Sequence, residues 1–215
     1  RPAAYLNLIM TLLGVIHGSL VLQQILQIGA QHLQFDWFGV GDMNLQIGFE
    51  LSLTNLAALE FVTAMSLLGQ VFALGYLDKE WSLARFYALV GFFEGAMAGV
   101  VLSSNLFFSF FLLEMLTLST YLLVGFWYAH PLVVTAARDA FLTKRVGDVL
   151  LLMGMVALSA WAGSLEFNDL YEWSATATAS GALSPLAGSL IGLGLIAGPM
   201  GKCAQFPMHL WLDEA

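Results

Sequence analysis

The chain has 215 residues, of which 59% are hydrophobic and only 10% are charged, and its formal net charge is −8. Its mean hydropathy of +0.81 exceeds what a soluble domain with one buried core accommodates, so the sequence predicts an all-α polytopic membrane protein. The single cysteine, Cys203, excludes an internal disulfide and argues against a cysteine-held metal or iron-sulfur centre in this chain.

Six stretches approach the ~20 apolar residues that cross a bilayer. They run approximately over 5–28, 51–77, 86–103, 106–129, 143–162 and 184–212, and Pro207 breaks the last. Between the first two, "QHLQFDWFGVGDMNLQIGFE" predicts a surface hairpin near 35–50 with its turn at 39–42. Between the last two, "GSLEFNDLYEWSATATASGALSP" predicts a polar connection with an amphipathic patch.

The loop charges divide between two sides when these six stretches are counted as crossings. One side carries the basic residues Arg1, Lys79, Arg85, Arg138, Lys144 and Arg145. The other side carries the acidic residues Asp36, Asp42, Glu50, Glu166, Asp169 and Glu172 and no Lys or Arg. By the positive-inside rule the basic loops are cytoplasmic, and Lys202 is the one cation left in the membrane.

Three carboxylates also fall inside the expected spans. Glu94 and Glu114 each lie ten residues from Ser104, so at ~1.5 Å per residue both sit about 15 Å below that surface, near mid-membrane. Glu60 falls at nearly the same level. One such glutamate is explained by a bond to a neighbouring helix. Together with Lys202 at similar depth, the three favour a proton relay, because burial disfavours the charged form of each group.

The stretch "GPMGKCAQFPMHLWLDEA" places Lys202 between Pro199 and Pro207, which predicts that the helix unwinds there. A broken helix at mid-membrane faces protein or a water-filled cavity, so the lysine is a candidate proton or ion site. Near Glu94, the glycines of "GFFEGAMAG" permit a close helix approach or serve plain packing.

Other titratable residues are weaker candidates. Arg145 and Asp148 are three residues apart, a spacing that permits a local ion pair with an anchoring or a coupling role. His17 and His209 lie in expected spans and are candidate proton carriers, although a lone histidine is more often a bonded structural residue. No metal-ligand spacing, phosphate loop or dinucleotide fingerprint is present, so we expect no metal and no cofactor in this chain.

The motifs "TKRVGDVLLLMG", "MGKCAQFPMHLWLDEA" and "E…STYLLVGFWY" resemble the large antiporter-like membrane subunit of complex I, the subunit 5 or L-type chain related to Mrp cation/proton antiporters. The resemblance implies an inverted-repeat fold in which each five-helix repeat contains a broken helix. Residues 1–85 would then be lead-in helices with the surface hairpin, and 86–215 most of the first repeat.

The resemblance also implies roles for individual residues. Glu114 matches the glutamate that pairs with the pumping lysine, Lys202 matches that lysine, and Asp148 with Arg145 matches the charged pair thought to modulate it. The chain departs from the family where many members read Gly-Trp-Glu and then Gly-Leu-x-Ser-Tyr, since it has "LLEMLTLSTY" there. Cys203 replaces a usual serine. Neither departure removes a titratable group.

The segment "FWYAHPLVVTAARDAFLTKRVGDVLLLMG" is similar to specialised F subunits of cyanobacterial photosynthetic complex I that serve CO2 uptake. This implies a proton-translocating subunit of a redox-driven NAD(P)H- or ferredoxin-plastoquinone oxidoreductase in the thylakoid membrane, with iron-sulfur clusters and plastoquinone elsewhere in the complex. Expected partners are other membrane subunits, especially an adjacent D-type subunit, a cytoplasmic CO2-hydrating protein and lipids, and no nucleic acid. Glu94 and Glu60 would extend the relay of Glu114 and Lys202.

Two other interpretations use the same residues. A free-standing Mrp-type antiporter would exchange Na⁺ for H⁺ through them. A non-pumping scaffold would instead dock the CO2-hydrating partner through the basic loops around Lys79, Arg85, His130 and Arg138. Replacement of Lys202 by alanine separates the scaffold, which would keep its activity, from a pump, which would not.

Overall fold

The computed structural model describes residues 1–40, 43–181 and 183–214, and it forms two compact units. Unit 1 contains residues 1–34 and 48–103, and unit 2 contains residues 35–47 and 104–215. Part of the turn expected at 39–42 lies outside the described residues, as does Asp42. The division at residue 85 into lead-in helices and first repeat stays a prediction.

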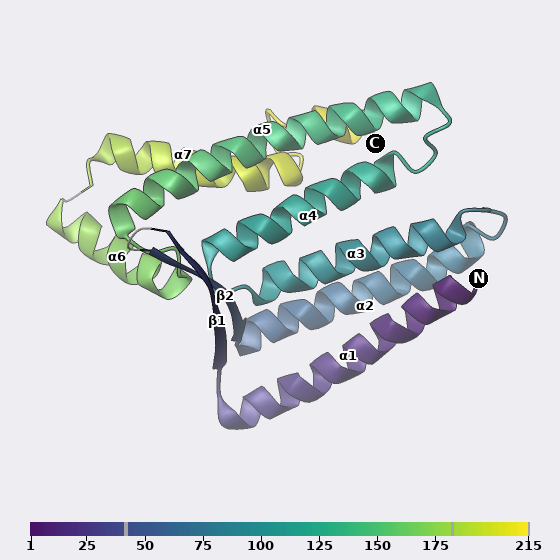
Figure 1. The fold of residues 1–215 in the computed structure, drawn as a ribbon, viewed down its shortest axis with the longest axis horizontal. Helices are drawn as coiled ribbons and strands as arrows, with labels where there is room; N and C mark the ends of the chain where they lie inside the picture. The colour runs from purple at the N-terminus through teal and green to yellow at the C-terminus, as the bar shows by residue number, and fades with distance from the viewer. Residues whose placement is uncertain (41–42, 182, 215) are drawn as a thin grey trace. The chain divides into compact units, whose positions relative to one another are not determined.

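Unit 1 is built on three long helices, α1 (Pro2–Ile28), α2 (Leu53–Tyr76) and α3 (Leu83–Leu102), which lie side by side (Figure 1). Pro2 is suited to the first turn of α1, where no hydrogen bond is lost, and Gly29 follows its end with a φ of 81°. Ser52 caps α2 by accepting a hydrogen bond from the Asn55 backbone N–H. Small and apolar side chains fill one part of the interface, namely Ala4, Ala73, Leu77, Leu83 and Tyr87.

The predicted hairpin is confirmed as a two-stranded sheet of β1 (Gln31–Val40) and β2 (Met43–Leu51). In unit 2 its outer part is attached to the start of α4 (Leu106–Val124). The Trp37 ring lies 5.9 Å from the Phe107 ring, and the Asn105 side-chain amide donates to the backbone oxygen of Gln46 at 2.9 Å. The Asn105 carbonyl oxygen also caps α4 by accepting from the Phe108 N–H at 2.7 Å.

Unit 2 continues with α5 (Pro131–Ala162), α6 (Phe167–Ser180), α7 (Pro185–Lys202) and the short α8 (Leu210–Glu214). Helices α5 and α7 lie along each other (Figure 1), and both begin with a proline in the first turn. Gly163, with a φ of 73°, follows α5 in the left-handed conformation common at helix ends.

Glycines bring the backbones of α5 and α7 together. A Cβ added at Gly154 of α5 would lie 2.8 Å from the Leu195 backbone nitrogen, and one added at Gly147 would lie 2.8 Å from the Ala197 oxygen. From the other side, a Cβ at Gly194 would lie 3.0 Å from the Gly154 Cα. Small residues permit such an approach, which is a common way of packing helices in a membrane.

The structure corrects where the fifth helix begins. The apolar pattern predicted a start near residue 143, with Lys144 and Arg145 at the cytoplasmic end of the helix, but α5 runs from Pro131 and both residues lie near its middle. The polar residues before 143 did not end the helix, because a long helix tolerates a charged, exposed first part. Lys202 is therefore not the one cation inside the helix bundle, because Lys144 of α5 is also buried there. The connection expected between the last two spans also contains a helix, the amphipathic α6.

Four of the described helices are long and apolar enough to cross a membrane, namely α1, α2, α3 and α4. Their outer faces carry exposed apolar side chains, including Leu6, Leu20, Phe61 and Phe72. The expected spans at 143–162 and 184–212 are helical too, in α5 and α7, but are not among these four. The mostly helical membrane fold that the sequence predicted is confirmed. Length and composition identify four candidate membrane crossings among the described helices.

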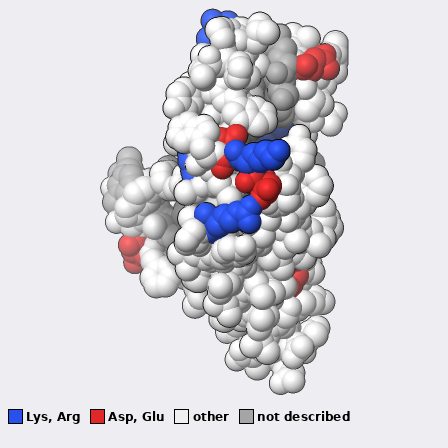
Figure 2. Space-filling model, turned by 90° about the vertical axis from the view of Figure 1, so that its right-hand side faces the viewer, with Lys and Arg blue, Asp and Glu red and all other residues white. Residues whose placement is uncertain are grey.

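Exposed charges gather at the helix ends. In unit 1, Arg1 and Asp78 form an ion pair in which both side chains are more than half exposed. Figure 2 looks onto the end of the molecule that carries the N-terminus and shows basic and acidic side chains close together in a largely uncharged surface. Charges at helix ends and apolar faces between them are the arrangement that a bilayer favours.

Candidate functional site at the helix break

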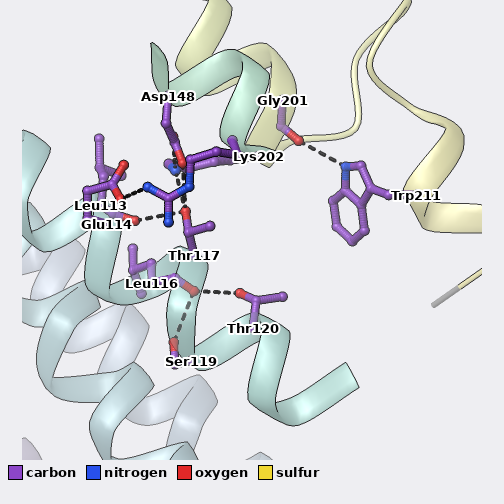
Figure 3. Close-up of polar contacts among 11 residues, drawn as sticks. Leu113, Glu114, Leu116, Thr117, Ser119, Thr120, Asp148, Gly201, Lys202 and Trp211 are labelled. Carbon is purple, nitrogen blue, oxygen red and sulfur yellow. Dashed lines mark hydrogen bonds and ion pairs between the residues drawn. The ribbon is translucent and has the colours of Figure 1, made fainter. Parts of the chain in front are cut away.

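Lys202 is the last residue of α7, and three helices meet around its side chain, which is only 16% exposed. Its Nζ donates to Asp148 Oδ1 on α5 at 2.5 Å and to Thr117 Oγ1 on α4 at 2.8 Å (Figure 3). Asp148 is almost completely buried. A buried charge is tolerated when it is paired and hydrogen-bonded, and both conditions are met here.

The second ion pair joins Arg145 of α5 to Glu114 of α4. Glu114 and Thr117 are three residues apart on α4, as Arg145 and Asp148 are on α5, so the two pairs are stacked about one helical turn apart. The Oε1 atom of Glu114 is buried and has no hydrogen-bond partner among the described residues.

These contacts correct the expected pairing. The spacing permitted a local pair of Arg145 with Asp148, and the resemblance implied a pair of Glu114 with Lys202. Neither is formed: Arg145 binds Glu114, and Asp148 binds Lys202. The physical reason is that the glycine contacts between α5 and α7 bring Lys202 against Asp148, so each charge on α5 finds its counter-ion on a different neighbouring helix.

The expected helix break is present. Helix α7 ends at Lys202, turns follow, and α8 starts at Leu210. Ala204, with a φ of 50°, adopts the left-handed conformation in the turn. The Cys203 and Gln205 N–H groups donate to the oxygens of Pro199 and Met200, both at 2.9 Å. These bonds satisfy part of the backbone that the break leaves open.

Three residues that were not candidates from the sequence complete the site, and two of them are Lys144 and Trp211. Lys144 is 5% exposed, and its ammonium lies 3.7 Å from the centroid of the Trp211 ring, a cation–π contact. The Trp211 indole N–H donates to the Gly201 oxygen at 2.9 Å (Figure 3). Trp211 thus binds the end of α7 and a buried cation of α5 at once. The signal in the sequence was weak, because a helix predicted to begin near residue 143 places Lys144 at its end and not in its interior.

Thr117 is the other missed residue. Its position three residues after Glu114 places both on one face of α4, and this spacing is the signal that could have identified it.

His209 was a candidate from the sequence. It lies in the break, where its Nδ1 is buried without a hydrogen-bond partner in the described part of the chain and its ring contacts Phe206.

Glu94 lies in unit 1 at the centre of a polar network between three helices. Its Oε2 accepts hydrogen bonds from Thr11 at 3.0 Å, from Ser66 at 2.5 Å and from the Gln70 amide at 2.8 Å. Asn7 in turn donates to Gln70 at 3.0 Å. None of the ion pairs of the described residues includes Glu94. It also lines a cavity of about 450 Å³ together with residues of α2 and α3.

The remaining candidates also lie in unit 1. Glu60 accepts a hydrogen bond from Ser19 at 3.0 Å, and its other oxygen is buried against Gly18, where a Cβ would overlap it. His17 is exposed on α1. Near Glu94, a Cβ at Gly91 would meet the Asn7 side chain, whereas one at Gly95 would meet nothing, so only Gly91 of these two serves a close approach.

The structure therefore brings Glu114, Lys202, Arg145 and Asp148 together in unit 2, with His209 in the same helix break. Glu94 and Glu60 belong to unit 1, each with its own hydroxyl donors. Among the described residues, no group of three or more His, Cys, Asp or Glu side chains could hold a metal ion.

Two family models match the chain. One describes the transmembrane region of NADH:quinone oxidoreductases and Mrp antiporters and matches residues 103–215. The other describes the N-terminus of complex I (NADH-ubiquinone oxidoreductase) chain 5 and matches residues 37–87. The first match includes all four charged residues of the site.

Curated relatives carry related names. An NAD(P)H-quinone oxidoreductase subunit 5 of the Paulinella chromatophora chromatophore is 68% identical over 217 residues, which cover 100% of this chain and 34% of that protein. NAD(P)H-quinone oxidoreductase chain 5 of Synechocystis is 33% identical over 201 residues, 94% of this chain and 30% of that protein. The chain thus spans about a third of the length of these relatives.

A solved structure shows the same fold. It is that of the membrane-bound sulfane sulfur reductase, an archaeal respiratory membrane complex, and it aligns with a TM-score of 0.80 at 16% identity over 98% of this chain and 41% of that one. At this identity the likeness supports the arrangement of the helices and carries no statement about the reaction.

Proposed function

Because the chain belongs to the NADH:quinone oxidoreductase/Mrp antiporter family of membrane proteins, we propose that it is a proton-translocating membrane subunit of an NAD(P)H-quinone oxidoreductase complex. The observation that carries this proposal is the buried Lys202, held at the end of a broken helix by Asp148 and Thr117. An ionisable residue inside a membrane bundle is a default candidate for proton transfer, and here its partner is also titratable.

The four charges of the site can be paired in two ways. The structure shows Lys202 on Asp148 and Arg145 on Glu114. The alternative places Lys202 on Glu114 and Arg145 on Asp148, which are three residues apart on one helix. Both arrangements are neutral in sum, because two carboxylates face one lysine and one arginine. We infer that protons move when the site changes from one arrangement to the other.

During such an exchange Lys202 leaves Asp148 before it reaches Glu114. In that interval no carboxylate faces its ammonium, and this is the step at which we propose that Lys202 transfers its proton. Glu114 Oε1 is buried without a partner among the described residues, and it can accept a proton during the same exchange. Arg145 keeps its charge throughout and serves as the counter-ion that passes between the carboxylates. The opening and closing of the pairs thereby links charge movement elsewhere in the complex to proton transfer here.

A finer proposal concerns the type of complex. We propose a thylakoid complex specialised for CO2 uptake, with iron-sulfur clusters and plastoquinone in other subunits, a D-type subunit beside this one and a CO2-hydrating partner at its cytoplasmic loops. The resemblance of the segment 126–154 supports this, as do the additional half-buried acids Glu60 and Glu94. Glu94 and Glu60 would carry the proton released by hydration away toward the relay of Glu114 and Lys202.

Replacement of Lys202 by alanine tests the proposal. In the intact complex in lipid vesicles, we expect Lys202→Ala to lower the number of protons moved per quinone reduced, because the titratable group of the break is lost. Proton uptake is measured with a pH-sensitive dye while quinone reduction is followed separately.

The control is Glu172→Gln, which alters an exposed glutamate of α6. An assembled Lys202→Ala complex that moves as many protons as the Glu172→Gln control would contradict the pump and favour a scaffold. Proton movement that requires added Na⁺ in the wild-type complex would instead favour cation/proton exchange.

A further inference from the structure

Among the described residues, Thr117 contacts both members of the Lys202–Asp148 pair. Its side chain comes from α4, whereas Asp148 belongs to α5 and Lys202 to α7, and Thr117 as a whole is only 2% exposed. The Oγ1 atom accepts a hydrogen bond from Lys202 Nζ at 2.8 Å and donates toward Asp148 Oδ2, which lies at 3.1 Å. The hydroxyl therefore joins the third helix to an ion pair formed by the other two.

The hydroxyl has one hydrogen and two acceptors within reach. The Leu113 backbone oxygen, one turn earlier on α4, lies 3.1 Å from Thr117 Oγ1, as far away as Asp148 Oδ2. Donation to such a carbonyl is a common alternative for threonine in a helix. Rotation about the C–O bond is enough to move the hydrogen from one acceptor to the other. In both orientations a lone pair of the oxygen remains available to Lys202.

From this geometry we propose that Thr117 is a positioning residue that holds the Lys202–Asp148 pair closed, and that its hydrogen turns to the Leu113 carbonyl when the pair opens. The inference rests on the proposed function of Lys202. With the hydrogen on Asp148, the carboxylate has a donor on each oxygen and stays in place. With the hydrogen on Leu113, Asp148 loses one donor and is freer to turn toward Arg145 on its own helix.

Several other charges surround Lys202, and a test of Thr117 must leave them unchanged. These groups are Asp148 and Lys144 on α5, the Arg145–Glu114 pair between α5 and α4, and His209 in the break. Replacing the Thr117 hydroxyl by a methyl group removes none of these charges, and of these groups only Asp148 loses a hydrogen bond to Thr117. A change in the pH dependence of proton movement would therefore report on the hydroxyl.

Two substitutions at residue 117 test the proposal in the intact complex. Thr117→Val keeps the shape of the side chain but removes a hydrogen-bond acceptor of the Lys202 ammonium, so the lysine loses its proton at lower pH. We expect the alkaline limb of the profile of protons moved per quinone against pH to shift down by about half to one unit, the size of one lost hydrogen bond. Thr117→Ser keeps the hydroxyl and should restore the wild-type profile.

The control is Thr120→Val. Thr120 lies on the same helix, and its hydroxyl bonds to the Leu116 backbone oxygen at 2.7 Å, away from the ion pairs (Figure 3). We expect its profile to match that of the wild type. Should Thr117→Val fail to assemble, Thr117→Ala removes the same hydroxyl without requiring space and carries the same expectation.

The proposal is overturned if Thr117→Val and Thr117→Ala leave the profile where it is in the wild type, or if Thr117→Ser shifts it as far as they do. The outcome is distinct from a failure of the proposed function. If Lys202→Ala abolishes this subunit's share of proton movement while the Thr117 variants show no shift, only the role of Thr117 is rejected.

Discussion

Lys144 is a second buried cation of the site, and none of the ion pairs among the described residues includes it. Lys144 is nearly as buried as Asp148, and it lies over the face of Trp211, whose N–H binds the oxygen of Gly201. An aromatic face attracts a cation more strongly when water is excluded. Trp211 therefore stabilises the last turn of α7, directly before Lys202, and the charge on α5 that faces it.

Replacement of Trp211 should weaken the break. We expect Trp211→Leu to destabilise the subunit by about 1–2 kcal/mol, because both the cation–π contact and the hydrogen bond to Gly201 are lost. Trp211→Phe keeps an aromatic face and should lose about half as much. Thermal denaturation of the purified complex measures the difference, and equal stability of the leucine and phenylalanine variants would argue against the cation–π contact.

Between elements, the contact of α5 with α7 decides which charges meet. Gly147 precedes Asp148, and Gly201 precedes Lys202, so the residues that allow the backbones to approach are the direct neighbours of the ion pair. A larger residue at these positions would separate the helices by the width of its side chain. The ion pair at 2.5 Å depends on that distance.

A substitution at Gly154 tests the helix contact away from the charges. Gly154→Leu places a side chain against the backbone of Gly194 and Leu195, and we expect a loss of about 1–3 kcal/mol or failure of assembly. Gly192→Ala is the control on α7, because a Cβ there has nothing within 4 Å. The amount of assembled complex on native gels measures both, and normal assembly of Gly154→Leu would contradict the close approach.

In the molecule as a whole, half-buried acids that bond to neighbouring helices occur in both units. Glu94 and its hydroxyl and amide donors belong to unit 1, and Glu114 with the two ion pairs belongs to unit 2. Glu94 accepts three hydrogen bonds on one oxygen but has no ion pair among the described residues, so its charge is balanced by dipoles. The proposed relay assigns this carboxylate the transfer of a proton in unit 1.

Glu94→Gln tests whether the relay extends into unit 1. Glutamine keeps a similar shape but cannot carry a proton, so in the intact complex we expect lower CO2 uptake and slower proton release. Glu172→Gln, which alters an exposed glutamate of α6, should change neither. CO2 uptake and proton release that stay at the wild-type level in Glu94→Gln would reject the extension and leave the Lys202 site untouched.

The sequence by itself determined the membrane class, the hairpin, most helix bounds and the break after Lys202. These features follow from local properties: runs of apolar residues, alternating strand patterns, capping residues and prolines. It also located the four charged residues of the site, because a charge inside an apolar run is costly and therefore conspicuous.

Only the tertiary structure decided which of these charges are partners. Spacing along one helix suggested Arg145 with Asp148, but both side chains find counter-ions on other helices, and Thr117, Lys144 and Trp211 join them. The reason is geometric: an ion pair forms within about 4 Å, and the distance between α5 and α7 is set by glycine contacts among residues about forty to fifty positions apart in the chain. No local pattern records that distance.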